Sequence, residues 1–317
     1  MRLVIAVSML WYLASLGSIQ WRSFYGLASV WQYTLTAILL AVVAIILQAM
    51  RLRWLIIAHG LTLSRRAAIR LTFIGQFFST YLPGAAGGDL VKIYYASKGN
   101  PGARAEVITI LLLDRFIGLF SLLTLPVLLA PFFINLIAVT HTLQALLVAS
   151  LIFALGVILA SFIGAKTDLA DSRFLRTIER FRFGRVLARA LHTLHFYRTN
   201  TGVILQALIS SYAVQIMMVG VTMATVQATN PTGADPRMLL LVPMGYLVNA
   251  LPVTPGGLGV GEAATESLFT ISGLDGGAEA ILGWRLIMIV VGFAGLAFYL
   301  KGEKRFVFDR RADGRSQ

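Results

Sequence analysis

Long apolar runs, separated by short intervals that hold the charges, constrain this 317-residue chain more than any other feature. A helix needs about 20 largely apolar residues to cross the roughly 30 Å hydrocarbon core of a bilayer. Six runs meet or approach this length: residues 3–18, 32–50, 107–130, 134–163, 202–226 and 278–300. We therefore predict an all-α polytopic membrane protein, with a single membrane domain over residues 1–300 and a basic tail over residues 301–317.

The composition supports a membrane protein and narrows its chemistry. Hydrophobic residues make up 57% of the chain and charged residues 13%, against roughly 45–50% and 25% in soluble domains. Cysteine is absent, which excludes disulfides, thiolate metal sites and CxxC redox chemistry. The four histidines lack HExxH spacing, and no GxxxxGK[ST] phosphate-binding loop occurs. We expect no metal, cofactor or catalytic residue, and we favour a transporter over an enzyme.

The first run has a second interpretation. Residues 3–18 follow Arg2 and are short, as in a secretory signal peptide. However, Trp11 and Tyr12 lie within the run, and no clear small-x-small cleavage site follows it. We therefore predict a membrane span and keep the signal peptide as the alternative.

Basic residues predict the direction of the chain, because Lys and Arg accumulate in cytoplasmic loops. The intervals that we place on the other side of the membrane hold only two basic residues, Arg22 and Arg237. We therefore place both termini in the cytoplasm and the protein in the cytoplasmic (inner) membrane. The net charge of +13 then faces an anionic leaflet and needs no nucleic acid as a partner. Three intervals that we place in the cytoplasm hold most of the bases: residues 51–70, 166–198 and 301–317.

The interval of residues 166–199 is predicted to be a cytoplasmic insert. Within residues 170–199, apolar residues recur at helical spacing between arginines, and Gly184 divides the pattern into two amphipathic helices. Such a helix lies in the headgroup layer and attracts anionic lipid. An ordinary basic loop is the alternative.

Two shorter apolar stretches, residues 67–82 and 238–251, each run into a cluster of the form L-P-x-x-x-G-G. Pro lacks a backbone donor and Gly admits unusual dihedral angles, so each cluster interrupts a helix. Paired interruptions in the two halves predict two re-entrant or broken segments in an inverted-repeat-like arrangement with a binding site between them. The first would enter from the cytoplasm and the second from the opposite face. Surface turns are the alternative.

Backbone N–H groups at such breaks suit an anion, because the N-terminus of a helix carries a partial positive charge. We therefore predict a backbone anion site at the two clusters. Its residues are Pro83, Gly87, Gly88, Pro252, Pro255, Gly256, Gly257 and Gly259.

Six charged side chains are predicted at membrane depth: Asp89, Lys92, Asp114, Arg115, Glu262 and Arg285. One charge at the bilayer centre costs on the order of 2.5–3.5 kcal/mol, so each needs a partner or water. We expect Asp89 to meet Lys92 at i, i+3, and Arg285 to meet Glu262 or Glu266. Glu262 and Glu266 repel each other at i, i+4, and protonation of one of them would allow proton coupling.

Asp114 and Arg115 are adjacent, so on a helix they point about 100° apart and need partners on other elements. A static network of salt bridges that holds the helices together is the alternative to a ligand site.

Four pieces of sequence carry a family resemblance. They are F-F-S-T-Y-L-P with G-G-D-L-V-K in residues 77–92, L-D-R-F-I-G in residues 113–118, L-P-V-T-P-G-G-L-G-V-G-E in residues 251–262 and W-R-L in residues 284–286. In this order they resemble the flippase-like membrane family that includes the transmembrane domain of lysylphosphatidylglycerol synthase. The resemblance implies translocation of a lipid or support of a lipid-linked pathway.

The chain departs from the family pattern at two places. Ser79 and Thr80 stand where the family often has an asparagine, and Lys92 stands where it often has an arginine. Lysine keeps the charge but loses the bidentate guanidinium fork. The soluble aminoacyl-transferase domain of lysylphosphatidylglycerol synthases does not follow in these residues, so we do not expect the chain to make aminoacylated lipid itself.

Our leading hypothesis is translocation of an anionic phospholipid or polyprenyl-phosphate-linked lipid. Lys92, Arg115 and Arg285 would neutralise the phosphate. Asp89, Asp114 and Glu262 would hold these bases or bind an amine or hydroxyl of the headgroup.

Two alternatives stay open. One is a membrane enzyme in which Asp89 and Asp114 bind a metal or act as a general base. The other is a non-catalytic accessory subunit that docks a lipid-modifying enzyme through residues 170–199. The sequence predicts neither the headgroup nor the direction of transport, the energy source, the oligomeric state, or whether the count is six spans or eight.

Overall fold

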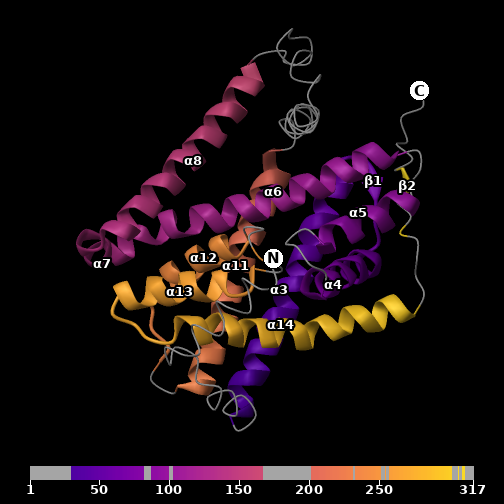
Figure 1. Cartoon of the computed structure of the whole chain (residues 1–317). Helices are drawn as coiled ribbons and strands as arrows, with labels where there is room; N and C mark the ends of the chain where they lie inside the picture. The colour runs from indigo at the N-terminus through magenta and orange to yellow at the C-terminus, as the bar shows by residue number, and fades with distance from the viewer. Residues whose placement is uncertain are drawn as a thin grey trace.

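A computed structural model describes most of the chain from residue 30 onwards (Figure 1). The predicted span of residues 3–18, the predicted insert after Lys166 and most of the tail lie outside the described residues. The described residues are 30–81, 87–99, 103–166, 201–230, 233–250, 254, 257–301, 306 and 309–310.

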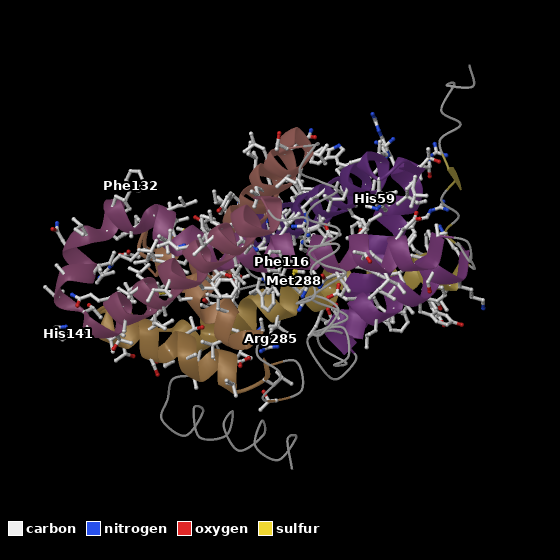
Figure 2. All side chains as sticks on the ribbon, turned by 90° about the horizontal axis from the view of Figure 1, so that it is seen from above. His59, Phe116, Phe132, His141, Arg285 and Met288 are labelled. Carbon is white, nitrogen blue, oxygen red and sulfur yellow. The ribbon has the colours of Figure 1, made fainter. Side chains whose placement is uncertain are left out.

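The described chain is helical apart from one two-residue ladder, and five helical segments are long and apolar enough to cross a membrane. This confirms the all-α polytopic membrane fold. The long helices are α3 (Trp31–Ala58), α6 (Arg104–Leu129), α8 (His141–Lys166), α11 (Thr201–Thr229) and α14 (Gly277–Leu300). Figure 2 shows Phe132 and His141 at one end of the molecule and His59 at the other, with Arg285 between them.

Four shorter helices flank the predicted breaks in two pairs. They are α4 (Arg65–Tyr81) and α5 (Gly87–Gly99) at the first break, and α12 (Met238–Asn249) and α13 (Val260–Ile271) at the second. At 12 to 17 residues and about 1.5 Å per residue, each is shorter than the roughly 30 Å hydrocarbon core. Each pair is therefore a hairpin of helices too short to cross the core, and we call the two pairs the first and the second hairpin.

One predicted span begins later than expected. The run of residues 134–163 was expected to be one helix, but α8 starts at His141. The 3₁₀ helix η3 (Ala130–Phe133) and the short helix α7 (Ile134–Val139) precede it, and Thr140 is extended with φ −122° and ψ 93°. Apolar residues flank Thr140 on both sides, so hydropathy alone did not reveal this break.

Two sets of four helices repeat the same pattern of packing. In the first set α3 packs on α4, α4 on α5 and α5 on α6. In the second set α11 packs on α12, α12 on α13 and α13 on α14. The contacts between the sets also match, because α6 touches α11 and α12 while α14 touches α3 and α4. The helices α3 and α11 pack on each other at the centre.

The two central helices run antiparallel. Ser210 Oγ donates to Leu47 O at 3.5 Å, whereas Gly220, farther along α11, lies beside the earlier residue Leu40. A two-fold axis that relates antiparallel spanning helices lies in the membrane plane. The arrangement is therefore an inverted repeat, as predicted.

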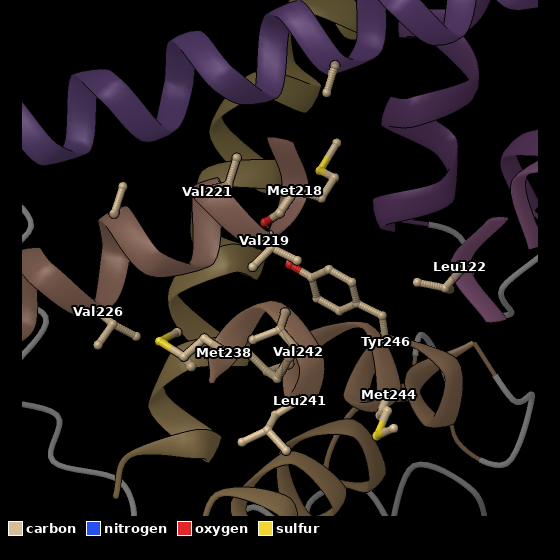
Figure 3. Close-up of a cluster of buried hydrophobic side chains, with 14 of the residues drawn as sticks. Leu122, Met218, Val219, Val221, Val226, Met238, Leu241, Val242, Met244 and Tyr246 are labelled. Atoms are coloured by element: carbon tan, nitrogen blue, oxygen red, sulfur yellow. Dashed lines mark hydrogen bonds between the residues drawn. The ribbon is translucent and has the colours of Figure 1, made fainter. Parts of the chain in front are cut away.

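Apolar packing at the centre of the second set holds the second hairpin in place. Tyr246 on α12 is buried, shares a hydrogen bond of 2.5 Å with Thr222 and donates to Met218 O at 3.1 Å, both on α11. Figure 3 shows its ring among the apolar side chains of α11 and α12. A Cβ on Gly245 would lie 2.2 Å from Thr265 Oγ1, so α12 and α13 approach closely only because residue 245 is glycine.

The segment after α14 contacts the loop after α3. Strand β2 (Asp309–Arg310) pairs with β1 (Leu61–Thr62) in an antiparallel ladder, and Phe306 is buried in the adjoining apolar cluster. Phe306, Asp309 and Arg310 of the tail therefore lie beside the loop after α3.

Candidate functional site

Backbone contact between α4 and α5 builds the first part of the site. A Cβ on Gly88 would lie 2.0 Å from both Gly75 O and Ser79 Oγ. Gly88 therefore has to be glycine for the two helices to meet. One on Gly75 would lie 2.2 Å from Lys92 Cε, so the lysine stem crosses the surface of α4 at Gly75. The small residues of this hairpin thus hold Lys92 in place.

Asp89 lies between two bases. It is the third residue of α5, where an acidic side chain interacts favourably with the helix dipole. Its Oδ2 accepts a hydrogen bond of 2.6 Å from Arg115 Nη1 on α6, and its Oδ1 lies 3.5 Å from Lys92 Nζ. The expected pair with Lys92 is present, and Arg115 has the expected partner on another helix. One carboxylate and two bases leave this group with a formal charge of +1.

Asp114 faces the other way along α6 and pairs with Arg51 on α3. Arg51 Nε donates to Asp114 Oδ1 at 2.7 Å, and its Nη1 donates to Ser211 Oγ on α11 at 2.6 Å. Both charged residues are buried. The guanidinium also lies against Gly118 of α6. This network joins three long helices from both halves of the molecule.

Arg51 does not lie in a cytoplasmic loop, although the sequence pattern places it in the cytoplasmic interval of residues 51–70. Instead, α3 continues to Ala58, and Arg51 is only 5% exposed. The signal was present, because the apolar residues 54–58 resume the span after Arg53. With Arg51 added, the set of charged residues predicted at membrane depth holds four bases and three acids.

A second buried group lies at the second hairpin. Glu262, the third residue of α13, accepts a hydrogen bond of 2.7 Å from Arg285 Nε on α14, and its other oxygen accepts one of 2.8 Å from Gly259 N. Arg285 Nη2 also donates to Asn249 Oδ1 at the end of α12. Of the two expected partners, Arg285 therefore meets Glu262. Glu266 instead accepts a hydrogen bond of 2.9 Å from Ala278 N.

Asn249 is a site residue that the sequence reasoning missed. Its side chain packs against Gly257 and Gly261, where any Cβ would collide with it. Gly257 and Gly259 have φ of 70° and 80°, which L side chains rarely adopt. The available signal was its place two residues before the second L-P pattern.

The two hairpins place their acids equivalently. Asp89 and Glu262 are each the third residue of the helix after a break, and each pairs with an arginine of the next long helix, Arg115 or Arg285. The two halves thus repeat the acid–arginine ion pair as well as the arrangement of helices.

Part of the predicted backbone anion site lies outside the described residues, namely Pro83, Pro252, Pro255 and Gly256. Gly87 and Gly88 begin α5, and Gly257 and Gly259 precede α13. The anion site itself remains a prediction. Within the described ranges, no group of three or more His, Asp or Glu side chains is placed to hold a metal ion.

The family model described as Lysylphosphatidylglycerol synthase TM region matches residues 1–295. No curated protein and no solved structure matches the chain.

Proposed function

The chain belongs to the family of the lysylphosphatidylglycerol synthase transmembrane region, and from that premise we propose that it moves an anionic lipid across the membrane. The family is one of membrane proteins related to lipid modification and to flippases. Anionic phospholipids and polyprenyl-phosphate-linked lipids share one feature, a phosphate ester with at least one negative charge.

The observation that carries this proposal is the shared carboxylate of Asp89. With Lys92 and Arg115 both on Asp89, the group keeps one positive charge, which a single phosphodiester would neutralise. The Arg115 side chain is 37% exposed, so its guanidinium is accessible to a headgroup. In a low-dielectric setting this attraction is much stronger than in water.

The other two ion pairs, Glu262–Arg285 and Arg51–Asp114, are proposed to have a structural role. Glu262 is fully buried and both of its oxygens are bonded, and the Arg51–Asp114 pair is buried and formally neutral. Removing one partner of such a pair typically costs about 3–5 kcal/mol, because it leaves a buried charge without compensation. Asp114, Glu262 and Arg285 would therefore fix the helices around the headgroup rather than bind it.

The inverted repeat supports movement between the two leaflets. Hairpins from opposite faces of the membrane, packed on α6 and α14, match the architecture in which one repeat rocks against the other around a central site. In this account the headgroup enters beside α5 and α6. The anionic leaflet would be met by the basic segment of residues 170–199, which lies outside the described residues.

Native mass spectrometry of the detergent-solubilised protein tests the headgroup site. We expect phosphatidylglycerol to stay bound in preference to phosphatidylcholine, and Lys92→Gln to abolish that preference. Lys98→Gln is the matched control, because Lys98 is an exposed lysine on the same helix. Equal retention of both lipids by the unaltered protein would contradict the proposal, as would equal losses in the two variants.

A further inference from the structure

The helix α8 has no counterpart among the described helices of the inverted repeat. It precedes α11 in the chain and packs on α6, the last helix of the first set. A two-fold counterpart of α8 would precede α3 and pack on α14, the last helix of the second set.

The contact between α8 and α6 covers one end of α6. The two helices meet at α7 and diverge from there (Figure 1). Along α6, Leu112, Phe116 and Leu119 share an exposed face. Leu123 and Val127 continue that face toward α7 and are only partly exposed. The buried residues of α8 follow helical spacing on one side: Leu143, Leu147, Ser150 and Ala154.

On α14 the equivalent face stays exposed to the end of the helix. Val290 and Phe293 are each 53% exposed, and Leu300 is 72% exposed. Exposed residues recur every three or four positions, which is one helix face: Leu286, Val290, Phe293, Ala297 and Leu300. The C-terminal half of α14 thus lacks the cover that α8 gives to α6.

We propose that residues 3–18, which lie outside the described residues, pack along the C-terminal half of α14 as the counterpart of α8. This run precedes α3 as α8 precedes α11, and it holds no charged residue. Arg2 and Lys301 are predicted on the same side of the membrane, which places the start of the run beside the end of α14. The partner of this surface is therefore a segment of the same chain.

The proposal gives each repeat one additional helix. It also makes residues 3–18 part of the folded membrane domain, in contrast to a cleaved signal peptide. It does not depend on which lipid the protein handles.

Disulfide cross-linking tests this contact directly, because the chain has no cysteine of its own. Ala297→Cys is combined with a single cysteine at each position from 4 to 15, and a specific protease site is inserted after Phe183. Oxidation in native membranes followed by cleavage leaves the two fragments joined only if a disulfide connects them. Because a disulfide needs Cα atoms about 4.4–6.8 Å apart, we expect joined fragments at positions that recur every three or four residues.

Ile209→Cys on α11 provides the matched control, since Ile209 is an exposed apolar residue that lies, like Ala297, after the inserted protease site. Its pairs with positions 4–15 should give no periodic cross-links. Four results would overturn the proposal: no joined fragments with Ala297→Cys, equal joining with Ile209→Cys, a covalent dimer from Ala297→Cys alone, or a purified protein whose mass lacks residues 1–18. Variants are compared only where their melting temperature equals that of the unaltered protein.

Discussion

Asp89 and Glu262 occupy equivalent positions in the two halves of the molecule but differ in exposure. Each pairs with an arginine of the next long helix, at 2.6 Å for Asp89 and 2.7 Å for Glu262. The Asp89 side chain is 25% exposed, whereas that of Glu262 is 0% exposed. The acid–arginine pair is therefore accessible to a ligand in the first half and buried in the second. For this reason we assign the lipid headgroup to the first half.

This difference predicts unequal costs of neutralising the two acids. Glu262→Gln leaves Arg285 without its counter-charge in a buried place and should lower the free energy of unfolding by about 3–5 kcal/mol. Asp89→Asn should cost within about 1 kcal/mol, because its ion pairs are partly exposed. Unfolding titrations in mixed micelles measure both, and the reverse order would contradict the assignment.

The network around Arg51 predicts strong coupling to Asp114. Arg51→Met and Asp114→Leu should each destabilise the protein by about 3–5 kcal/mol, whereas the double variant should be much less destabilised than their sum. A double-mutant cycle measures the coupling. Additive losses would show that the 2.7 Å contact contributes no net stabilisation.

The close approach of α4 and α5 predicts a steric effect at Gly88. Gly88→Ala places a methyl group against Gly75 O and Ser79 Oγ and should destabilise by about 1–3 kcal/mol through overpacking. Gly156→Ala on α8 is the matched control, because a Cβ there meets nothing within 4 Å. We expect this control to be neutral or stabilising, since alanine favours a helix over glycine. Equal melting temperatures for the two variants would count against the described hairpin packing.

The histidine at the end of α3 predicts a pH dependence of stability. His59 follows the span, and burial lowers its pKa below 6.5, an effect that the nearby Glu106 opposes. The unfolded chain therefore takes up a proton more readily than the folded protein, so stability falls as the pH drops below about 6.5. Melting temperatures at about pH 7.5 and about pH 5.5 should differ less for His59→Gln than for the unaltered protein. An identical difference in both would exclude His59 as the source.

Hydropathy and glycine–proline patterning predicted most of the fold, because spans and breaks are properties of short stretches of chain. The i, i+3 pair of Asp89 and Lys92 could be foreseen for the same reason. The contacts of Asp114 with Arg51 and of Arg285 with Asn249 join residues that are far apart in the chain. Local patterning therefore places Arg51 in a loop, and it does not bring Asn249 together with Arg285.

The glycine–proline pattern also did not predict how far the hairpin helices extend. The helices after the breaks, α5 and α13, depend on glycines whose tolerance for close backbone contact shows only in three dimensions, as at Gly88 and Gly257. The exposure that separates Asp89 from Glu262 likewise follows from packing rather than from local sequence.

Lipid translocation in proteoliposomes tests the central claim most directly. Fluorescent phosphatidylglycerol in the inner leaflet becomes accessible to an impermeant quencher only after it has crossed the bilayer. The account predicts that the unaltered protein and Lys98→Gln expose the inner-leaflet probe, that Lys92→Gln and Arg115→Gln do so much more slowly, and that labelled phosphatidylcholine crosses slowly with all of them. Crossing at the protein-free rate, with and without a pH gradient, would contradict lipid transport. Equal rates for Lys92→Gln and Lys98→Gln would contradict the headgroup site at Asp89, Lys92 and Arg115.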